Sequence, residues 1–130
     1  MNTILFETHS GWRYVVLLVS AVALIKFIYG WLAKSEWSKL DRQLIIAYAA
    51  VLTIQWLLGI VLWIMRMMPM NMVYIEHLVT MTLALAPAHI TLSRVNKASS
   101  SGAKYRTATI FTGISTLLVW IGVALITGVI

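Results

Sequence analysis

Long apolar runs alternate with short polar stretches along the whole chain, and this alternation predicts four helices. The runs lie near 11–33, 44–66, 73–93 and 107–130, and each reaches roughly the 20 residues that a helix needs to cross a bilayer core. Neighbouring helices should be antiparallel because the connections are short. The pattern therefore predicts an all-α, up-down four-helix bundle, with residues 1–130 forming a single transmembrane domain. No lysine or arginine precedes the first run before Arg13, so we expect a retained helix there and not a signal peptide.

The composition supports a membrane-embedded chain and excludes several kinds of site. Of the 130 residues, 61% are hydrophobic and only 11% are charged, which leaves too little polar surface for a soluble domain of this size. The chain has no cysteine, so it has no disulfide, thiolate-held cluster or thioether-attached haem. The sequence contains no hydrolytic triad, phosphate loop or zincin helix, and we therefore do not predict a stand-alone enzyme.

The placement of the basic residues, which give a formal net charge of +6, predicts an orientation. The side opposite them holds only Arg13 and Arg66, so the positive-inside rule places both termini and the turn at 67–72 on the non-cytoplasmic side of a bacterial inner membrane. This distribution is typical of a protein oriented in lipid and not of one that binds nucleic acid. Lys26, inside the first run, should extend its amine to the cytoplasmic interface. The basic residues of the predicted cytoplasmic side are Lys34, Lys39, Arg42, Arg94, Lys97, Lys104 and Arg106.

The third run carries ionisable residues that a purely lipid-facing helix has little reason to hold. Glu76, His77 and His89 lie in it, and such groups are costly at membrane depth unless they face a partner, a cavity or a cofactor. His89 is about 18 Å further along the helix than His77, so these two histidines cannot bind one metal. Pro87 removes a helical hydrogen bond and is expected to kink the helix near His89. We interpret His89 as structural or as part of a separate inner site.

His9 is expected at the depth of His77, since both lie near the predicted outer ends of their helices. Two neutral imidazoles from different helices can hold a haem iron, and arginine or tyrosine side chains can pair with its propionates. The sequence therefore predicts a b-type haem near the outer face, with His9 and His77 as metal ligands. Its function would be electron transfer in the membrane. The predicted cofactor-binding residues are His9, His77, Arg13, Tyr14, Arg66 and Glu76.

Three features together resemble a known family. They are the stretch His-Ser-Gly-Trp-Arg-Tyr at 9–14, Gln55 with Gly59, and the pair Glu76-His77. The pattern resembles small four-helix bacterial membrane proteins that are often labelled cytochrome b-like. The resemblance covers the whole chain in helix number, and it implies a joint role for His77 and the histidine, arginine and tyrosine of 9–14. Some members carry a histidine in the second helix near the position of Thr53, and its absence here argues against a ligand from that helix.

The same outer cluster also allows a site without metal. Oxidation of a quinol needs a proton acceptor, which His77 or Glu76 could supply, and groups such as His9 or Tyr14 that hold a ring oxygen. Such a site needs a redox partner, so this alternative predicts a subunit of a larger respiratory or photosynthetic complex. Bacteriochlorophyll held through one histidine belongs to the same class.

Two further alternatives involve neither haem nor quinone. The segment Met65–Met72 holds five thioethers, which are soft ligands suited to Cu(I), although flexible methionines also fill irregular turns. Alternatively, the chain is an accessory subunit without any cofactor that packs against larger membrane subunits. Small residues of the fourth run suit close helix packing in lipid: Thr112, Gly113, Ser115, Thr116 and Gly122.

Overall fold

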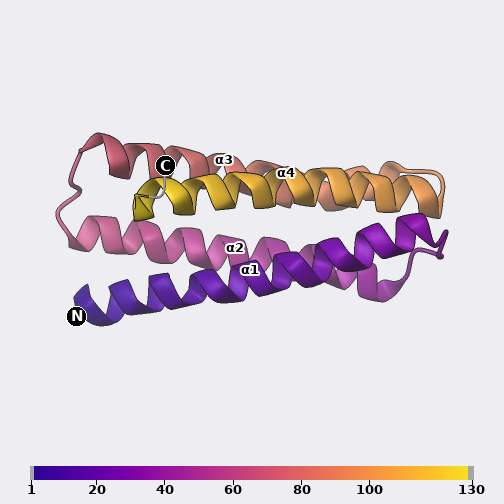
Figure 1. Cartoon of the computed structure of the whole chain (residues 1–130), viewed down its shortest axis with the longest axis horizontal. Helices are drawn as coiled ribbons and strands as arrows, with labels where there is room; N and C mark the ends of the chain where they lie inside the picture. Colours follow the sequence, from indigo (N-terminus) through magenta and orange to yellow (C-terminus); the bar gives the residue numbers. More distant parts are fainter. Residues whose placement is uncertain (1, 129–130) are drawn as a thin grey trace.

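The computed structural model describes residues 2–128, and within them the chain forms four helices and no strand. The helices are α1 (Asn2–Leu32), α2 (Lys39–Met65), α3 (Met72–Lys97) and α4 (Ser101–Thr127). Figure 1 shows them antiparallel in up-down order, with both ends of the described chain at the end that carries the α2–α3 connection. The predicted all-α four-helix bundle is confirmed.

All four helices are long and apolar enough to cross a membrane, judged by length and composition. Their outward faces are aliphatic, because large side chains such as Leu18, Ile25 and Leu117 are more than half exposed. Such an apolar surface is unfavourable in water and favourable in lipid hydrocarbon. A helix can lie in hydrocarbon because its backbone groups are hydrogen-bonded within the helix. These features indicate a multi-pass membrane protein.

The helices begin earlier than the apolar runs suggested, and polar caps explain the difference at two of them. Ser38 accepts a hydrogen bond from the backbone of Asp41, and the Asp41 side chain accepts one from the Ser38 backbone, which is a capping box. At the start of α4 the Ser100 hydroxyl accepts a hydrogen bond from Ala103 N at 3.1 Å. Caps lie outside apolar segments, so hydropathy alone places these helix starts too late.

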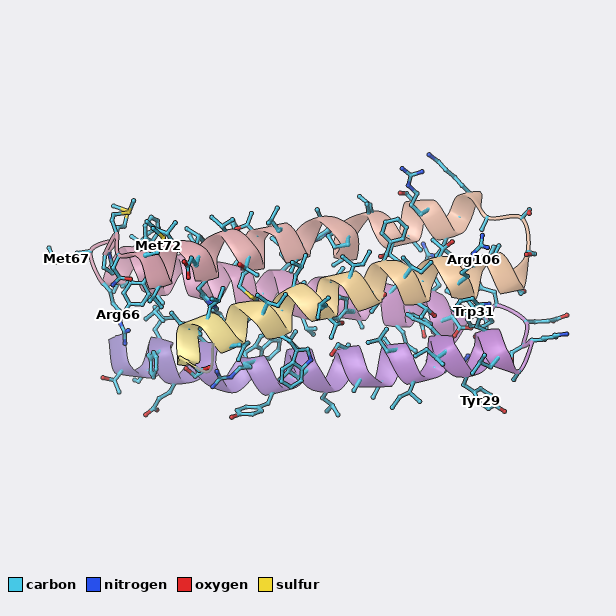
Figure 2. The ribbon with its side chains drawn as sticks, turned by 45° about the horizontal axis from the view of Figure 1, so that its top comes forward. Tyr29, Trp31, Arg66, Met67, Met72 and Arg106 are labelled. Carbon is cyan, nitrogen blue, oxygen red and sulfur yellow. The ribbon has the colours of Figure 1, made fainter. Side chains whose placement is uncertain are left out.

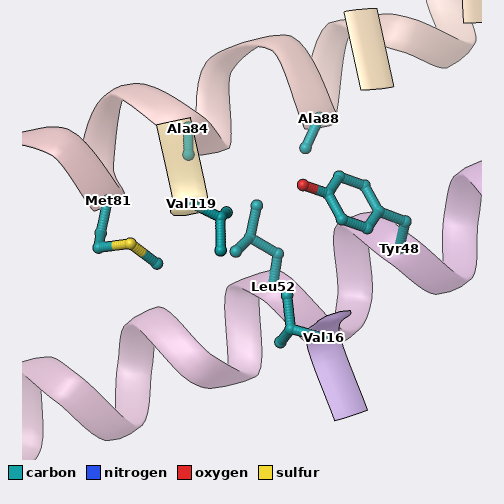
Figure 3. Close-up of a cluster of buried hydrophobic side chains, with 7 residues drawn as sticks. All are labelled: Val16, Tyr48, Leu52, Met81, Ala84, Ala88 and Val119. Atoms are coloured by element: carbon teal, nitrogen blue, oxygen red, sulfur yellow. The ribbon is translucent and has the colours of Figure 1, made fainter. Parts of the chain in front are cut away.

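Each helix packs against two neighbours, in the cyclic order α1, α2, α3 and α4. The most extensive contacts join α3 to α4 and α1 to α2, the α2–α3 contact is the weakest of the four, and α1 lies diagonally opposite α3. Figure 3 shows the central core, to which all four helices contribute. Ser115 Oγ donates to the Ala84 carbonyl at 2.8 Å and lies 2.7 Å from Tyr48 Oη, so the buried hydroxyls are paired. The cluster comprises Val16, Tyr48, Leu52, Met81, Ala84, Ala88 and Val119.

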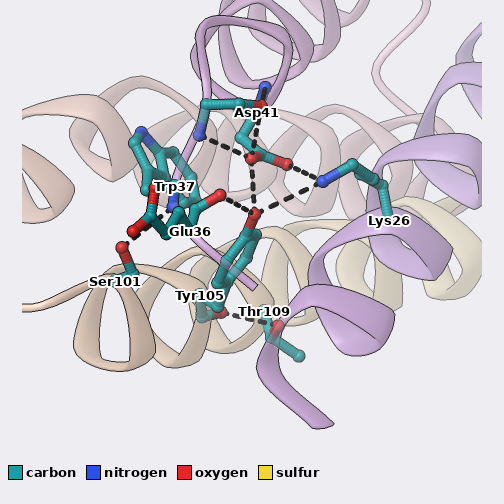
Figure 4. A network of polar contacts seen from close by, with 8 residues as sticks. Lys26, Glu36, Trp37, Asp41, Ser101, Tyr105 and Thr109 are labelled. Atoms are coloured by element: carbon teal, nitrogen blue, oxygen red, sulfur yellow. Dashed lines mark hydrogen bonds and ion pairs between the residues drawn. The ribbon is translucent and has the colours of Figure 1, made fainter. Parts of the chain in front are cut away.

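A second core lies toward the α1–α2 connection and encloses a polar cluster that we call the Asp41 network, in which Asp41 is bonded to Lys26, Ser38 and Tyr105. Figure 4 shows Lys26, Asp41 and Tyr105 together. Lys26 Nζ lies 2.7 Å from Asp41 Oδ1, and Tyr105 Oη donates to Asp41 Oδ2 at 2.6 Å. The Asp41 side chain is fully buried. We expected the Lys26 amine to extend to the membrane interface, and the sequence analysis did not predict its ion pair with Asp41. The network joins α1, α2 and α4 at one point, because each helix supplies one of the bonded groups.

Candidate functional site

His9 and His77 face each other across the bundle. They come from α1 and α3, the diagonal pair, and their ring centroids lie 6.4 Å apart with an interplanar angle of 81°. Arg66 lines a cavity together with both histidines, and Figure 2 shows Arg66 beside the α2–α3 connection, so the pair lies toward that end of the bundle. Within residues 2–128 there is no group of three or more histidine, cysteine, aspartate or glutamate side chains placed to hold a metal ion.

The His77 ring is fixed by the backbone of α4. Its Nδ1 lies 2.7 Å from the carbonyl oxygen of Gly122, and because a carbonyl only accepts, Nδ1 carries the proton. In the neutral ring the lone pair is then on Nε2. A histidine whose far nitrogen donates to a carbonyl is the usual arrangement of a metal ligand, since that bond fixes both tautomer and ring orientation.

His9 is held differently, by packing and through its backbone. Its carbonyl accepts a hydrogen bond from Gln55 Nε2 at 2.8 Å, and its ring lies against Gly59, where an added Cβ would be 3.0 Å from His9 Cε1. Two buried side-chain nitrogen or oxygen atoms in the described chain have no hydrogen-bond partner, and they are His9 Nδ1 and Gln55 Oε1. Unpaired buried groups are rare and call for a reason. These two atoms come from residues in contact with each other, and both residues line the two cavities beside the imidazole pair.

Two cavities adjoin the imidazole pair. One, of about 90 Å³, lies between α2 and α3, and the other, of about 210 Å³, lies between α1 and α4. His9, Gln55, His77 and Met81 line both of them. The first is otherwise mainly aromatic and aliphatic. The pair is therefore accessible from two sides of the bundle.

The structure brings two of the predicted arginines to these cavities. Arg13 lines the α1–α4 cavity, and Arg66 lines the α2–α3 cavity. The Arg66 guanidinium also lies 4.8 Å from the centre of the Phe6 ring. Each cavity thus has one cation beside it.

The structure does not bring Tyr14 or Glu76 into the site. Tyr14 is 66% exposed, and the neighbouring Arg13 guanidinium lies 5.4 Å from the centre of its ring. Glu76 is exposed and lines neither cavity. The reason is helical geometry, because successive residues point about 100° apart, so a residue adjacent to His77 or Arg13 cannot share its inward direction.

The predicted cofactor-binding residues also omitted residues that line the site, although Gln55 was one of the features of the family resemblance. Gln55 and Met81 border both cavities, and the Gly122 carbonyl anchors His77. Met81 is four residues after His77, which is the spacing that places two side chains on one helix face. That signal was present in the sequence, whereas no sequence pattern reveals the role of a backbone carbonyl.

His89 is remote from the imidazole pair and has its own partner. Its Nε2 lies 2.7 Å from Thr53 Oγ1, and the Thr53 hydroxyl donates to the Ala49 carbonyl at 2.7 Å. A hydroxyl has one proton to donate, so Thr53 accepts from His89 Nε2. This bond links α2 to α3, the neighbouring helices with the least extensive contact. The helix α3 continues through Pro87.

The imidazoles of His9 and His77 are a suitable donor pair for the iron of a haem. The two cavities beside them could hold a haem only if side chains moved. The two ring centroids lie 6.4 Å apart, and histidine nitrogen is a common ligand of haem iron. Cavities that enclose ligands of that size are typically about 300–1,000 Å³, larger than either cavity here. Met81 and Gln55 line both cavities, and methionine is the most adaptable of apolar side chains, so a haem would require these side chains to move.

Comparison of the chain with protein-family models, with curated proteins and with solved structures finds no match.

Proposed function

We propose that this chain binds a b-type haem through His9 and His77 and transfers electrons in a membrane. The observation that supports the proposal most strongly is the approach of two imidazoles from diagonally opposed helices, at a ring separation of 6.4 Å, beside two cavities. Haem supplies one-electron chemistry that no side chain of this protein provides. His9 and His77 would hold the iron, and the haem would supply the electron transfer.

The residues around the pair would each contribute a distinct interaction. The Gly122 carbonyl holds the His77 ring and makes its Nε2 the better ligand. Arg13 and Arg66, one at each cavity, are placed to pair with carboxylates of the cofactor. Trp56 and Trp63 line the α2–α3 cavity and would exclude water from that side.

The membrane placement is part of the same proposal. Seven of the ten basic residues belong to the α1–α2 and α3–α4 connections and their flanks, so we place that end in the cytoplasm and both termini on the outer side of a bacterial inner membrane. The haem would then lie near the outer face. A single-haem protein needs an electron donor and an acceptor, and we propose that other membrane subunits of an energy-transducing complex supply them.

A reduced-minus-oxidised visible spectrum with metal analysis tests the proposal directly. Protein purified in mild detergent should show sharp reduced haem bands and roughly one iron per chain. His9→Ala and His77→Ala should lose both signals. His89→Ala is the matched control, since it removes an imidazole bonded only to Thr53, and it should keep them.

Two results would overturn the haem assignment. One is retention of haem by the His77→Ala protein. The other is a featureless spectrum without iron from wild-type protein that circular dichroism shows to be helical and fully extracted. Metal analysis on the same sample also tests for copper at the segment Met65–Met72, whose five methionines are all exposed.

A quinone site is the second candidate, because the α2–α3 cavity is largely apolar and has His77 in its wall. Trp56, Trp63 and Tyr74 also line it, and its other polar side chains are those of His9, Gln55 and Arg66. Aromatic walls with a few polar groups suit a quinone ring. A quinone analogue should then quench tryptophan fluorescence in a saturable way, and His77→Ala should abolish that quenching while His89→Ala should not. If the chain binds neither haem nor quinone, the remaining candidate is a cofactor-free accessory subunit. Co-purification of membrane partners tests that candidate.

A further inference from the structure

A basic cavity lies at the end of the bundle remote from the imidazole pair. This cavity is an open surface depression of about 410 Å³ between the end of α3 and the start of α4, and Arg94, Lys97 and Arg106 line it. Figure 2 places Arg106 at the opposite end of the bundle from Arg66 and Met67. The cavity is therefore separate from the proposed haem site.

The positive charge of this cavity is not balanced by nearby acidic groups. No aspartate or glutamate lines it, and the one ion pair found within residues 2–128 joins Lys26 and Asp41 elsewhere. Three cations around one space attract an anion strongly. The hydroxyls of Ser99 and Thr107 also line the cavity and can donate hydrogen bonds to anionic oxygens.

An apolar track continues from the cations toward the middle of the bundle. On α4, Ile110, Ile114 and Leu117 follow Arg106 at helical spacing along one face, and each is exposed. On α3, exposed Ile90 precedes Arg94 by one turn. A ligand that uses both features is an amphiphile with an anionic head and an aliphatic chain.

We propose that the cavity binds the phosphate of an anionic phospholipid, with an acyl chain along the exposed face of α4. Basic pockets between helices at a membrane surface recognise lipid headgroups in this way. The inference rests on the membrane insertion in the proposed function and is independent of haem. An inorganic anion would use the cations and hydroxyls but gain nothing from the aliphatic track.

The test measures lipid binding to the purified full chain by native mass spectrometry. The protein in mild detergent is offered an equal mixture of phosphatidylglycerol and phosphatidylcholine. Wild type should bind phosphatidylglycerol preferentially, and the triple variant Arg94→Gln/Lys97→Gln/Arg106→Gln should bind it at least tenfold more weakly, since each cation near an anionic lipid contributes about fivefold. Phosphatidylcholine binding should not change, and inorganic phosphate should not displace the bound lipid.

The matched control removes three other cations from the same end of the bundle. Lys34→Gln/Lys39→Gln/Arg42→Gln makes the same change in net charge outside this cavity and should keep the preference for phosphatidylglycerol. Equal loss in both triple variants would show that diffuse charge attracts the lipid, and this would overturn the site. An unchanged preference in the site variant, or displacement by inorganic phosphate, would also overturn it.

A fold check keeps the result interpretable. Each variant is first examined by circular dichroism, and if the triple variant is unfolded, Arg106→Gln alone decides, with an expected loss of about fivefold. Selective lipid binding by a protein that lacks haem would refute the haem proposal and leave this inference standing. Haem bands from a protein without lipid selectivity would support the haem proposal and refute the lipid site.

Discussion

Replacing Gly30 with alanine should destabilise the bundle far more than the same change at Gly113. Gly30, on α1, packs so closely on Tyr105 of α4 that a Cβ would overlap the ring, whereas a Cβ at Gly113 meets nothing within 4 Å. The Tyr105 ring is fully buried, and its centre lies 5.0 Å from that of Trp37. Its hydroxyl is bound to Asp41 at 2.6 Å. The ring therefore has no free direction in which to move.

The size of the effect follows from these contacts. Overpacking a well-filled core costs about 1–3 kcal/mol, and loss of a hydrogen bond to a charged group adds about 1.5–3 kcal/mol if the Tyr105 hydroxyl is pulled from Asp41. Alanine recovers about 0.5–1 kcal/mol through its higher helix propensity. The net loss for Gly30→Ala should be about 3 kcal/mol, while Gly113→Ala should be neutral or gain up to about 1 kcal/mol.

The free energy of unfolding can be measured by titrating denaturing detergent into mixed micelles and following tryptophan fluorescence. A third protein identifies the cause, because Gly30→Ala should cost much less in a Tyr105→Leu background, where the ring is gone. Equal stabilities of the Gly30→Ala and Gly113→Ala proteins would refute the packing argument. So would an undiminished cost of Gly30→Ala in the Tyr105→Leu background.

Two other substitutions probe the two polar centres of the molecule. Lys26→Met keeps the stem but leaves the buried Asp41 carboxylate without its cation; because the Lys26 side chain is 30% exposed, we expect about 1–3 kcal/mol of destabilisation, less than for a fully buried pair. The control Lys34→Met, at an exposed site, should change the unfolding free energy by under about 0.5 kcal/mol. Equal effects of Lys26→Met and Lys34→Met would contradict a stabilising role of the Lys26–Asp41 ion pair. Gly59→Ala should press on the His9 ring and shift the reduced haem band or the midpoint potential without loss of haem. An unaltered spectrum and potential would show that the ring has room to move.

The sequence alone determined the class of fold. Four apolar runs joined by short polar stretches have few solutions in lipid, because each backbone must pair its own hydrogen bonds and short connections force antiparallel neighbours. It also drew attention to His9 and His77, since ionisable groups in apolar helices are conspicuous. The helix starts were less accurate, because the capping residues Ser38 and Ser100 carry no hydropathy signal.

Only the tertiary structure decided which residues meet. The helical period fixes the angle between two side chains on the same helix, but it does not fix how that helix is rotated against its neighbours. Rotation brings His9 and His77 together and turns Tyr14 and Glu76 outward. It also pairs groups that sequence reasoning left apart, such as the Gly122 carbonyl with His77. Such contacts depend on the packing of all four helices at once, and that packing is set by side-chain shapes distributed over the whole chain.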